Sequence, residues 1–163
     1  MKKLRLLITK ECNRNCPGCC NKDWNLDTLP ICESFKGYDE ILLTGGEPYL
    51  YGIIPFVDLI HKIRSENNTC KIFVYSAHSG ITDILDYIDG LTFTLHDQKD
   101  VPLFDILNLA LYESDKEKSL RLNIFQGIKL PDNIDLSFWK VKKDMEWIKD
   151  CPLPKDEVFM RLQ

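Results

Sequence analysis

The sequence predicts an α/β fold in which a parallel sheet forms an open, partial (β/α)6 barrel. Six runs rich in β-branched and apolar residues recur at fairly even intervals. Several are nearly continuous, which is typical of parallel strands covered on both faces. Segments with helical periodicity lie between these runs, and strands alternating with helices indicate βαβ units. The first and last connections lack that periodicity, so we expect both crossovers to be degenerate and the barrel to stay open.

The strands of this barrel are expected wherever an apolar run is bounded by polar or turn-forming residues. No internal repeat and no low-complexity stretch interrupts the series. In chain order the expected strands are Leu4–Thr9, Glu40–Thr44, Lys71–Ser76, Leu91–Leu95, Leu120–Phe125 and Leu136–Val141.

Three helices are expected between the strands. Ile53–Ser65 carries apolar residues at helical spacing, and so does Pro102–Tyr112. A shorter helix is expected over Ile84–Ile88, where Thr82 and Asp83 are candidate N-caps. The helices therefore follow the second, third and fourth strands.

The remaining connections are expected to lack regular secondary structure. Residues 20–38 predict one or two irregular turns, and residues 126–135 predict a loop without a helix. We expect residues 1–150 to form the core domain and residues 151–163 to form an extended tail that packs on the barrel edge. Val158–Met160 would cover that edge, because an open strand edge invites pairing with another chain.

Composition narrows the class of protein. The chain of 163 residues suits one domain, with 44% hydrophobic and 28% charged residues. A net charge of −4 gives no basic excess, so no nucleic-acid partner is expected. No apolar run is long enough for a membrane span, and the apolar part of MKKLRLL is too short for a signal peptide. We therefore expect a cytoplasmic protein without a membrane partner, in which clustered cysteines usually bind metal.

The most informative motif is a cysteine triad. Cys12, Cys16 and Cys19 follow the first expected strand with the spacing C-x3-C-x2-C. Three thiolates this close together can hold three irons of a cubane iron–sulfur cluster and leave the fourth iron open to a small molecule. The alternative is zinc, which usually takes four ligands in paired C-x2-C arrangements. Cys20 is a candidate fourth thiolate, but adjacent residues rarely point at the same metal, and Cys70 and Cys151 are isolated in the sequence.

A second motif follows the second expected strand. Gly45 and Gly46 allow a backbone to approach a ligand closely, and Glu47 next to them can accept a hydrogen bond from an amine. The carboxyl ends of parallel strands meet at one edge of the sheet, so both motifs are expected on the same edge.

Together, the cysteine triad and Gly45-Gly46-Glu47-Pro48 resemble the radical S-adenosylmethionine (radical SAM) superfamily. The resemblance implies a [4Fe–4S] cluster held by Cys12, Cys16 and Cys19, with S-adenosylmethionine on the fourth iron. Gly45, Gly46 and Glu47 would bind the amine of the cofactor. Reductive cleavage of the sulfonium would release a 5′-deoxyadenosyl radical that abstracts hydrogen from a substrate. A low-potential electron donor of the flavodoxin or ferredoxin type is implied as a partner.

The same resemblance suggests further cofactor-binding residues at the strand ends. Ser76, His96 and Asn123 hold positions from which such residues commonly bind the ribose, carboxylate or adenine, although caps and turns are the alternative. His96 and Asp97 stand out because two polar residues end an apolar strand abruptly. Arg121 is a further candidate for pairing with a carboxylate, or for a surface salt bridge.

The segment CPGCCNKDW resembles the small glycyl-radical activating enzymes, especially activases of anaerobic ribonucleotide reductase. The counterparts here are Cys16–Cys19, Asn21 and Trp24. Those activases often have Gly-Gly-Asp where this chain has Gly-Gly-Glu, and no Gly-Pro-Gly precedes the cysteines. A barrel this small is expected to act on a polypeptide or partner protein that completes the cavity. The alternative class is non-enzymatic, either an iron–sulfur electron carrier or a zinc-stabilised binding module.

Overall fold

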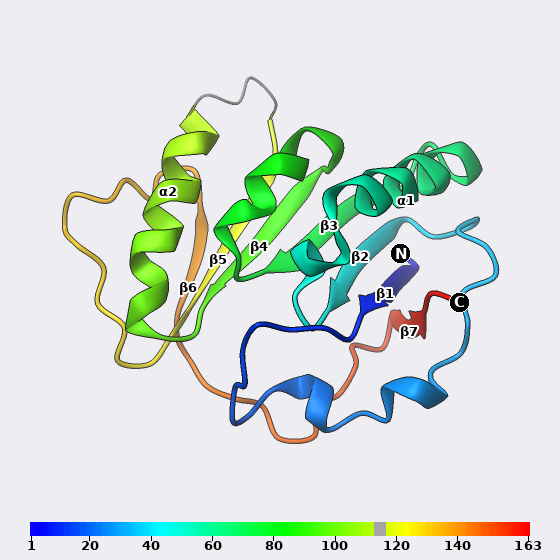
Figure 1. The fold of residues 1–163 in the computed structure, drawn as a ribbon, viewed down its shortest axis with the longest axis horizontal. Helices are drawn as coiled ribbons and strands as arrows, with labels where there is room; N and C mark the ends of the chain where they lie inside the picture. Colours follow the sequence, from blue (N-terminus) through cyan, green and yellow to red (C-terminus); the bar gives the residue numbers. More distant parts are fainter. Residues whose placement is uncertain (113–116) are drawn as a thin grey trace.

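The fold is an open α/β sheet of seven parallel strands (Figure 1), seen in a computed structural model that describes residues 1–112 and 117–163. The strand order is β6-β5-β4-β3-β2-β1-β7, so β6 and β7 form the two edges. The strands are β1 (Lys3–Thr9), β2 (Glu40–Gly45), β3 (Lys71–Ser76), β4 (Gly90–Leu95), β5 (Ser119–Phe125), β6 (Lys140–Met145) and β7 (Glu157–Arg161).

The helices cover one face of this sheet. Strands β1 to β6 are added in chain order in one direction, and right-handed parallel crossovers then place the helices that connect them on the same side. Figure 1 shows α1 (Ile53–Glu66), the 3-10 helix η4 (Ser79–Tyr87) and α2 (Val101–Tyr112) along that side, with η4 in contact with both α-helices.

The main core lies between the helices and the sheet. Alternate strand residues such as Leu6, Leu43, Val74 and Phe93 point into it and are fully buried. Successive residues of a strand face opposite sides of the sheet. The strand residues that alternate with these buried ones therefore lie on the opposite face. That face carries polar and charged side chains, including the ion pair between Arg5 and Glu157.

A smaller apolar cluster covers one end of the opposite face. Leu7, Leu29 and Phe159 are buried there, and the Trp24 ring meets the Phe159 ring edge-on with centroids 5.4 Å apart. The expected irregular turns in residues 20–38 are present as η1 (Cys20–Lys22) and η2 (Leu26–Thr28).

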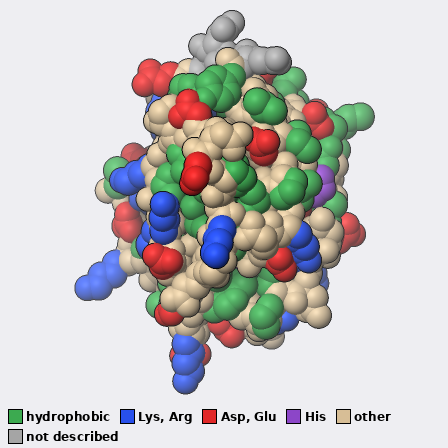
Figure 2. All heavy atoms as spheres, turned by 90° about the vertical axis from the view of Figure 1, so that its left-hand side faces the viewer, with side chains coloured by type: hydrophobic (Ala, Val, Ile, Leu, Met, Phe, Trp, Pro, Cys, Tyr) green, Lys and Arg blue, Asp and Glu red, His purple; other side chains and the backbone are tan. Residues whose placement is uncertain are grey.

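The face that carries α2, at the left of Figure 1 and turned toward the viewer in Figure 2, shows hydrophobic side chains interspersed with acidic and basic ones. Ile106, Leu109 and Tyr112 of α2 are about half or more exposed. Apolar side chains scattered in this way are normal for a protein surface.

The first five strands and the two longer helices are confirmed within one or two residues at each end. The short helix expected over Ile84–Ile88 is instead part of η4, which begins at Ser79. Thr82 and Asp83 do not cap it, because His78 takes that role and its Nδ1 accepts from Gly80 N at 3.0 Å. The loop expected over 126–135 contains no helix.

The prediction of the last core strand was wrong in position. The expected strand Leu136–Val141 overlaps β6 only at Lys140 and Val141. Leu136 and Trp139 instead belong to a turn, closed by Trp139 N donating to Leu136 O at 2.9 Å, that packs under α2. The strand itself is the charged run KVKKDM, and lysines on an edge strand discourage pairing with other chains.

The tail is extended, as predicted, and it adds a seventh strand. Strand β7 pairs in parallel with β1, with Lys3 opposite Glu157 and Leu7 opposite Arg161. The strand therefore covers the β1 edge of the sheet. No helix among residues 1–112 and 117–163 is long and apolar enough to cross a membrane.

The packing of the 136–139 turn on α2 is testable through Asn108. This residue is 3% exposed, accepts from Trp139 Nε1 at 2.8 Å and donates to Asp135 O at 2.9 Å. We expect Asn108→Ala to lower the free energy of unfolding by about 1–3 kcal/mol, because the buried indole N–H loses its partner. The matched control is the adjacent Leu109→Ala, at a 62% exposed position, with an expected change within about 0.5 kcal/mol. Equal urea midpoints for the two variants would contradict this packing.

Candidate functional site

Four segments meet at the carboxyl-terminal edge of the sheet. They are the cysteine loop after β1, the Gly-Gly-Glu segment after β2, and the ends of β3 and β4. Together they surround a pocket of about 160 Å³. Its lining includes Cys12, Cys16, Cys19, Gly45, Gly46, Glu47, Ser76 and His96.

The two sequence motifs are in direct backbone contact. Gly46 N donates to Thr9 O at 2.9 Å, and Glu47 N donates to Glu11 O at 2.7 Å. A Cβ at Gly46 would lie 2.1 Å from Glu11 O, and one at Gly45 would lie 2.3 Å from Thr9 O. Any side chain at either position would therefore displace the chain leading into the cysteine loop.

The far side of the cysteine loop is also fastened. Asn21 Nδ2 donates to Gly45 O at 2.6 Å, so the loop contacts the Gly-Gly segment from both ends. Lys22 Nζ donates to Cys16 O at 2.7 Å and to Asn15 Oδ1 at 3.0 Å. These bonds connect Lys22 to the loop at its second cysteine.

A buried ion pair holds the middle of the loop. Arg14, between the first two cysteines, reaches the fully buried Asp100 with Nη1–oxygen distances of 2.7 and 2.8 Å, and its Nη2 donates to Ala77 O at 3.0 Å. Asp100 also accepts from the backbone N–H groups of His96 and Asp97 at 2.8 and 3.0 Å. The ion pair thus joins the loop to the ends of β3 and β4.

Glu47 is buried, and its carboxylate is occupied by donors from the protein. It accepts from Ser76 Oγ at 2.6 Å, Ala77 N at 2.9 Å and Tyr49 N at 3.1 Å. The Ser76 hydroxyl, expected among the cofactor-binding groups, is engaged here and also accepts from His78 N at 3.0 Å. In this arrangement Glu47 and Ser76 position the ends of β2 and β3, and a cofactor-binding role for either stays a prediction.

The three loop thiols line the pocket without converging on one point. Cys12 is exposed, whereas Cys16 and Cys19 are partly exposed. Burial raises the pKa of the Cys16 thiol, and the neighbouring Cys19 acts in the same direction. Among the described residues, no group of three or more His, Cys, Asp or Glu side chains is arranged to hold a single metal ion.

His96 stands at the wall of the pocket. Its ring stacks on the Trp147 indole with centroids 5.3 Å apart and planes 10° apart. Burial lowers the pKa of the imidazole, and the Arg14 charge adds to this effect, so the ring is neutral near pH 7. Its Nδ1 is buried and has no hydrogen-bond partner in the described part of the chain.

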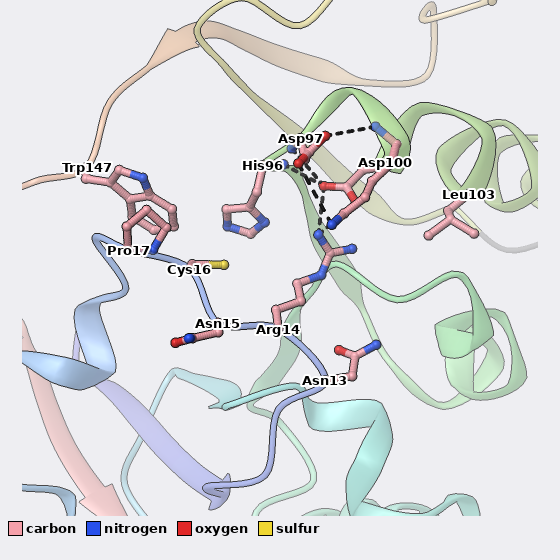
Figure 3. Close-up of a pocket in the computed structure, with 11 residues that line it drawn as sticks. Asn13, Arg14, Asn15, Cys16, Pro17, His96, Asp97, Asp100, Leu103 and Trp147 are labelled. Carbon is pink, nitrogen blue, oxygen red and sulfur yellow. Dashed lines mark hydrogen bonds and ion pairs between the residues drawn. The ribbon is translucent and has the colours of Figure 1, made fainter.

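A larger cavity of about 680 Å³ lies beside the pocket (Figure 3). The two share Arg14, Cys16, His96 and Trp147 as lining residues. In Figure 3, Trp147 stands beside Pro17 across from His96. The cavity and the thiol pocket are therefore neighbours divided by side chains that belong to both.

Other predicted site residues lie away from the thiols. Asn123 is on β5 opposite Thr94, which lines the pocket, but Asn123 is not among the lining residues. Arg121 lies nearer the amino-terminal end of β5, opposite Thr92 on β4. Tyr49, which was not among the predicted residues, stacks on His78 with centroids 4.5 Å apart, which is a packing role.

Two residues at the site were missed in the sequence. Arg14 lies in the cysteine loop, where a cation is a usable signal for an anchor or a charge partner. Trp147 gave no signal, because it lies in irregular chain after β6.

The residue directly after the cysteine triad is in a disulfide. Cys20 is bonded to Cys151, and the fold brings these two residues together across 131 residues of sequence.

Comparison with known proteins does not assign the chain to a family. No protein-family model matches the sequence, and no curated protein is similar enough to match it. The site geometry is therefore the basis for a functional proposal.

The anchoring role of Arg14 is testable by substitution. We expect Arg14→Ala to lower the free energy of unfolding by about 3 kcal/mol, because the buried Asp100 carboxylate would lose its cation. The control is Lys10→Ala, which removes an ion pair with Asp27 at the start of the same loop. Both side chains of that pair are more than half exposed, so no measurable change is expected. Chemical unfolding at pH 7 measures both, and an unaffected Arg14 variant would refute the anchoring role.

Proposed function

We propose that the chain is a minimal radical SAM enzyme built on an open, partial (β/α)6 barrel whose β1 edge is covered by β7. The observation that carries the proposal is the backbone contact between the cysteine loop and the Gly-Gly-Glu segment. That contact brings three thiols and the Gly45-Gly46 backbone to one pocket at the carboxyl-terminal edge of a parallel sheet. Active sites occupy this edge in parallel β/α barrels.

The donor set suits a [4Fe–4S] cluster. Thiolates are the ligands that iron–sulfur clusters take, and Cys12, Cys16 and Cys19 all line the pocket. A single ion needs its ligands to converge, with Zn–S distances of about 2.3 Å. The cysteines of a cluster bind different irons and do not need to meet at one point, which suits thiols arranged around a pocket.

The surroundings of the thiols also suit a bound cofactor. Gly45 and Gly46 line the pocket without side chains, so a ligand can approach their backbone closely. The buried Nδ1 of His96 has no hydrogen-bond partner among the described residues, so a ligand could satisfy it. Arg14 places a positive charge beside Cys16 that partly offsets the effect of burial, which raises the pKa of this thiol.

The chain contributes positioning and exclusion of water. When bound, the cluster and S-adenosylmethionine would supply reductive cleavage of the sulfonium and hydrogen abstraction from a substrate. Arg14 and Asn21 hold the loop, and Glu47 ties the Gly-Gly segment to the end of β3. The Trp147 indole shields one side of the pocket from solvent.

The shape of the site supports a polypeptide or partner protein as the substrate. The 680 Å³ cavity beside the thiols is lined by polar loop residues such as Asn13 and Asn15, with Leu103 and Trp147 as apolar contacts. A polypeptide or partner protein, as in glycyl-radical activation or peptide modification, would complete the enclosure. A low-potential electron donor of the flavodoxin or ferredoxin type is the expected redox partner.

The test is anaerobic reconstitution of the full chain with iron and sulfide, followed by reduction with dithionite. We expect the electron paramagnetic resonance spectrum of the reduced cluster to change when S-adenosylmethionine is added, and 5′-deoxyadenosine to form. Cys16→Ala should lose most of the bound iron and all of the product. Cys32→Ala is the matched control, because this partly exposed cysteine lies outside the pocket, and it should behave like the unaltered chain.

The competing classes give different outcomes. A reducible cluster whose spectrum ignores S-adenosylmethionine, with no 5′-deoxyadenosine, would identify an electron carrier. A chain that retains one zinc ion through purification and assembles no cluster would identify a zinc-stabilised module. Either result would refute the proposed activity.

A further inference from the structure

A short segment after β6 forms one wall of the site, and little holds it in place. The strap, defined here as residues 146–151, has no helix or strand, and all of it is exposed except Cys151. Figure 1 shows this part of the chain passing close to the cysteine loop on its way to β7. At its start, Glu146 Oε1 accepts from Gln126 Nε2 at 2.7 Å.

Trp147 is the part of the strap that reaches the site. A Cβ at Gly18 would lie 2.2 Å from Trp147 Cγ, so the indole rests directly on the backbone between the second and third loop cysteines. The same ring stacks on His96 and lies 4.5 Å from the Phe125 ring by centroids. Trp147 lines both the thiol pocket and the larger cavity. The position of the strap therefore sets the shape of both.

The other end of the strap is joined covalently to the loop. Cys151 is disulfide-bonded to Cys20, the residue directly after the third cysteine of the triad. Two adjacent residues at this end, Asp150 and Cys151, have φ of 61° and 37°. Aspartate tolerates this left-handed region, but cysteine has no such preference, and it stays there only where its surroundings hold it. The backbone of Cys151 is thus held by its attachment.

We propose that the Cys20–Cys151 pair is a thiol–disulfide exchange site that fastens the strap, and with it Trp147, to the cysteine loop. Cys20 is partly exposed and Cys151 is buried, so an incoming thiolate reaches the Cys20 sulfur first. The reductant is a dithiol, whether a small molecule or a protein.

The exchange balances as a two-electron step. A thiolate of the dithiol attacks the Cys20 sulfur and forms a mixed disulfide, and Cys151 leaves as a thiolate that takes up a proton. The second thiol of the reductant then displaces Cys20, which is released as a thiol. Two electrons and two protons pass to the cysteine pair, and the dithiol becomes a disulfide.

Reduction leaves the strap with only weak attachments. The Glu146–Gln126 hydrogen bond and the Trp147 ring contacts remain, and Cys151 is free to leave its left-handed conformation. Exposed chain with so few contacts opens locally at low free-energy cost. The wall shared by the pocket and the cavity would then move. This property belongs to the chain whether or not a cluster binds, so it goes beyond the proposed function.

The test uses the full chain without a cluster, poised with either oxidised or reduced dithiothreitol. After alkylation of free thiols, peptide mapping of the oxidised sample should show Cys20 linked to Cys151. Hydrogen–deuterium exchange of the strap should become roughly tenfold faster on reduction. Trp147→Phe should reduce the fluorescence difference between the two states, because the other tryptophans, Trp24 and Trp139, lie in packed clusters.

Variants separate this pair from the other thiols. Cys151→Ser and Cys20→Ser should each show fast exchange in the strap in both states, and Cys32→Ser should keep the full redox response. A pairing of Cys20 with a thiol of the triad instead of Cys151 would overturn the proposal. So would a Cys20–Cys151 bond whose reduction leaves strap exchange unchanged. None of these readouts requires bound iron, so they succeed or fail separately from the radical SAM assay.

Discussion

The backbone contact at Gly45 and Gly46 is the constraint on which the site depends. Strand β2 brings these residues to the carboxyl-terminal edge of the sheet. There, Thr9 O and Glu11 O of the segment that leads into the cysteine loop lie within hydrogen-bond distance of the Gly46 and Glu47 amides. A chain can run this close only over residues that lack a side chain. This contact fixes the position of the cysteine loop at the carboxyl-terminal edge of the sheet. The three thiols therefore face a pocket instead of open solvent. A loop attached only at the end of β1 would have no defined position.

Two buried carboxylates also hold this edge of the sheet in place, although burying a charge costs free energy. Glu47 and Asp100 are each 3% exposed or less, and a buried charge is tolerated only when its oxygens are fully bonded. Backbone amides and Ser76 satisfy Glu47, whereas Asp100 requires the Arg14 guanidinium. The network therefore cannot form until β2, β3, β4 and the loop are all in place. Such a requirement favours one arrangement of the edge over many, which is what a site for positioned chemistry needs.

The parts of this structure that were predictable are those encoded locally. Apolar periodicity located β1 to β5 and both long helices, and the two motifs were correctly expected at the same edge. The turn at Leu136–Trp139 was mistaken for a strand because an apolar run looks the same whether it packs as a strand or as a turn. Arg14 pairs with Asp100, which is 86 residues away, and Trp147 stacks on His96, which is 51 residues away. The Cys20–Cys151 bond spans 131 residues of sequence. No local sequence pattern indicates contacts between residues so far apart in the chain.

The two faces of the sheet differ in what covers them, and this difference leaves the carboxyl-terminal edge available for the site. The helix-covered face contains the main apolar core and provides most of the burial that stabilises the fold. The opposite face is only partly covered, by the Leu7, Leu29 and Phe159 cluster, and ion pairs such as Arg5–Glu157 satisfy its charges. Loops cover the carboxyl-terminal edge of the sheet, and the strap supplies one wall of the pocket there. The side chain of Trp147 therefore forms a wall that the thiol pocket and the larger cavity share.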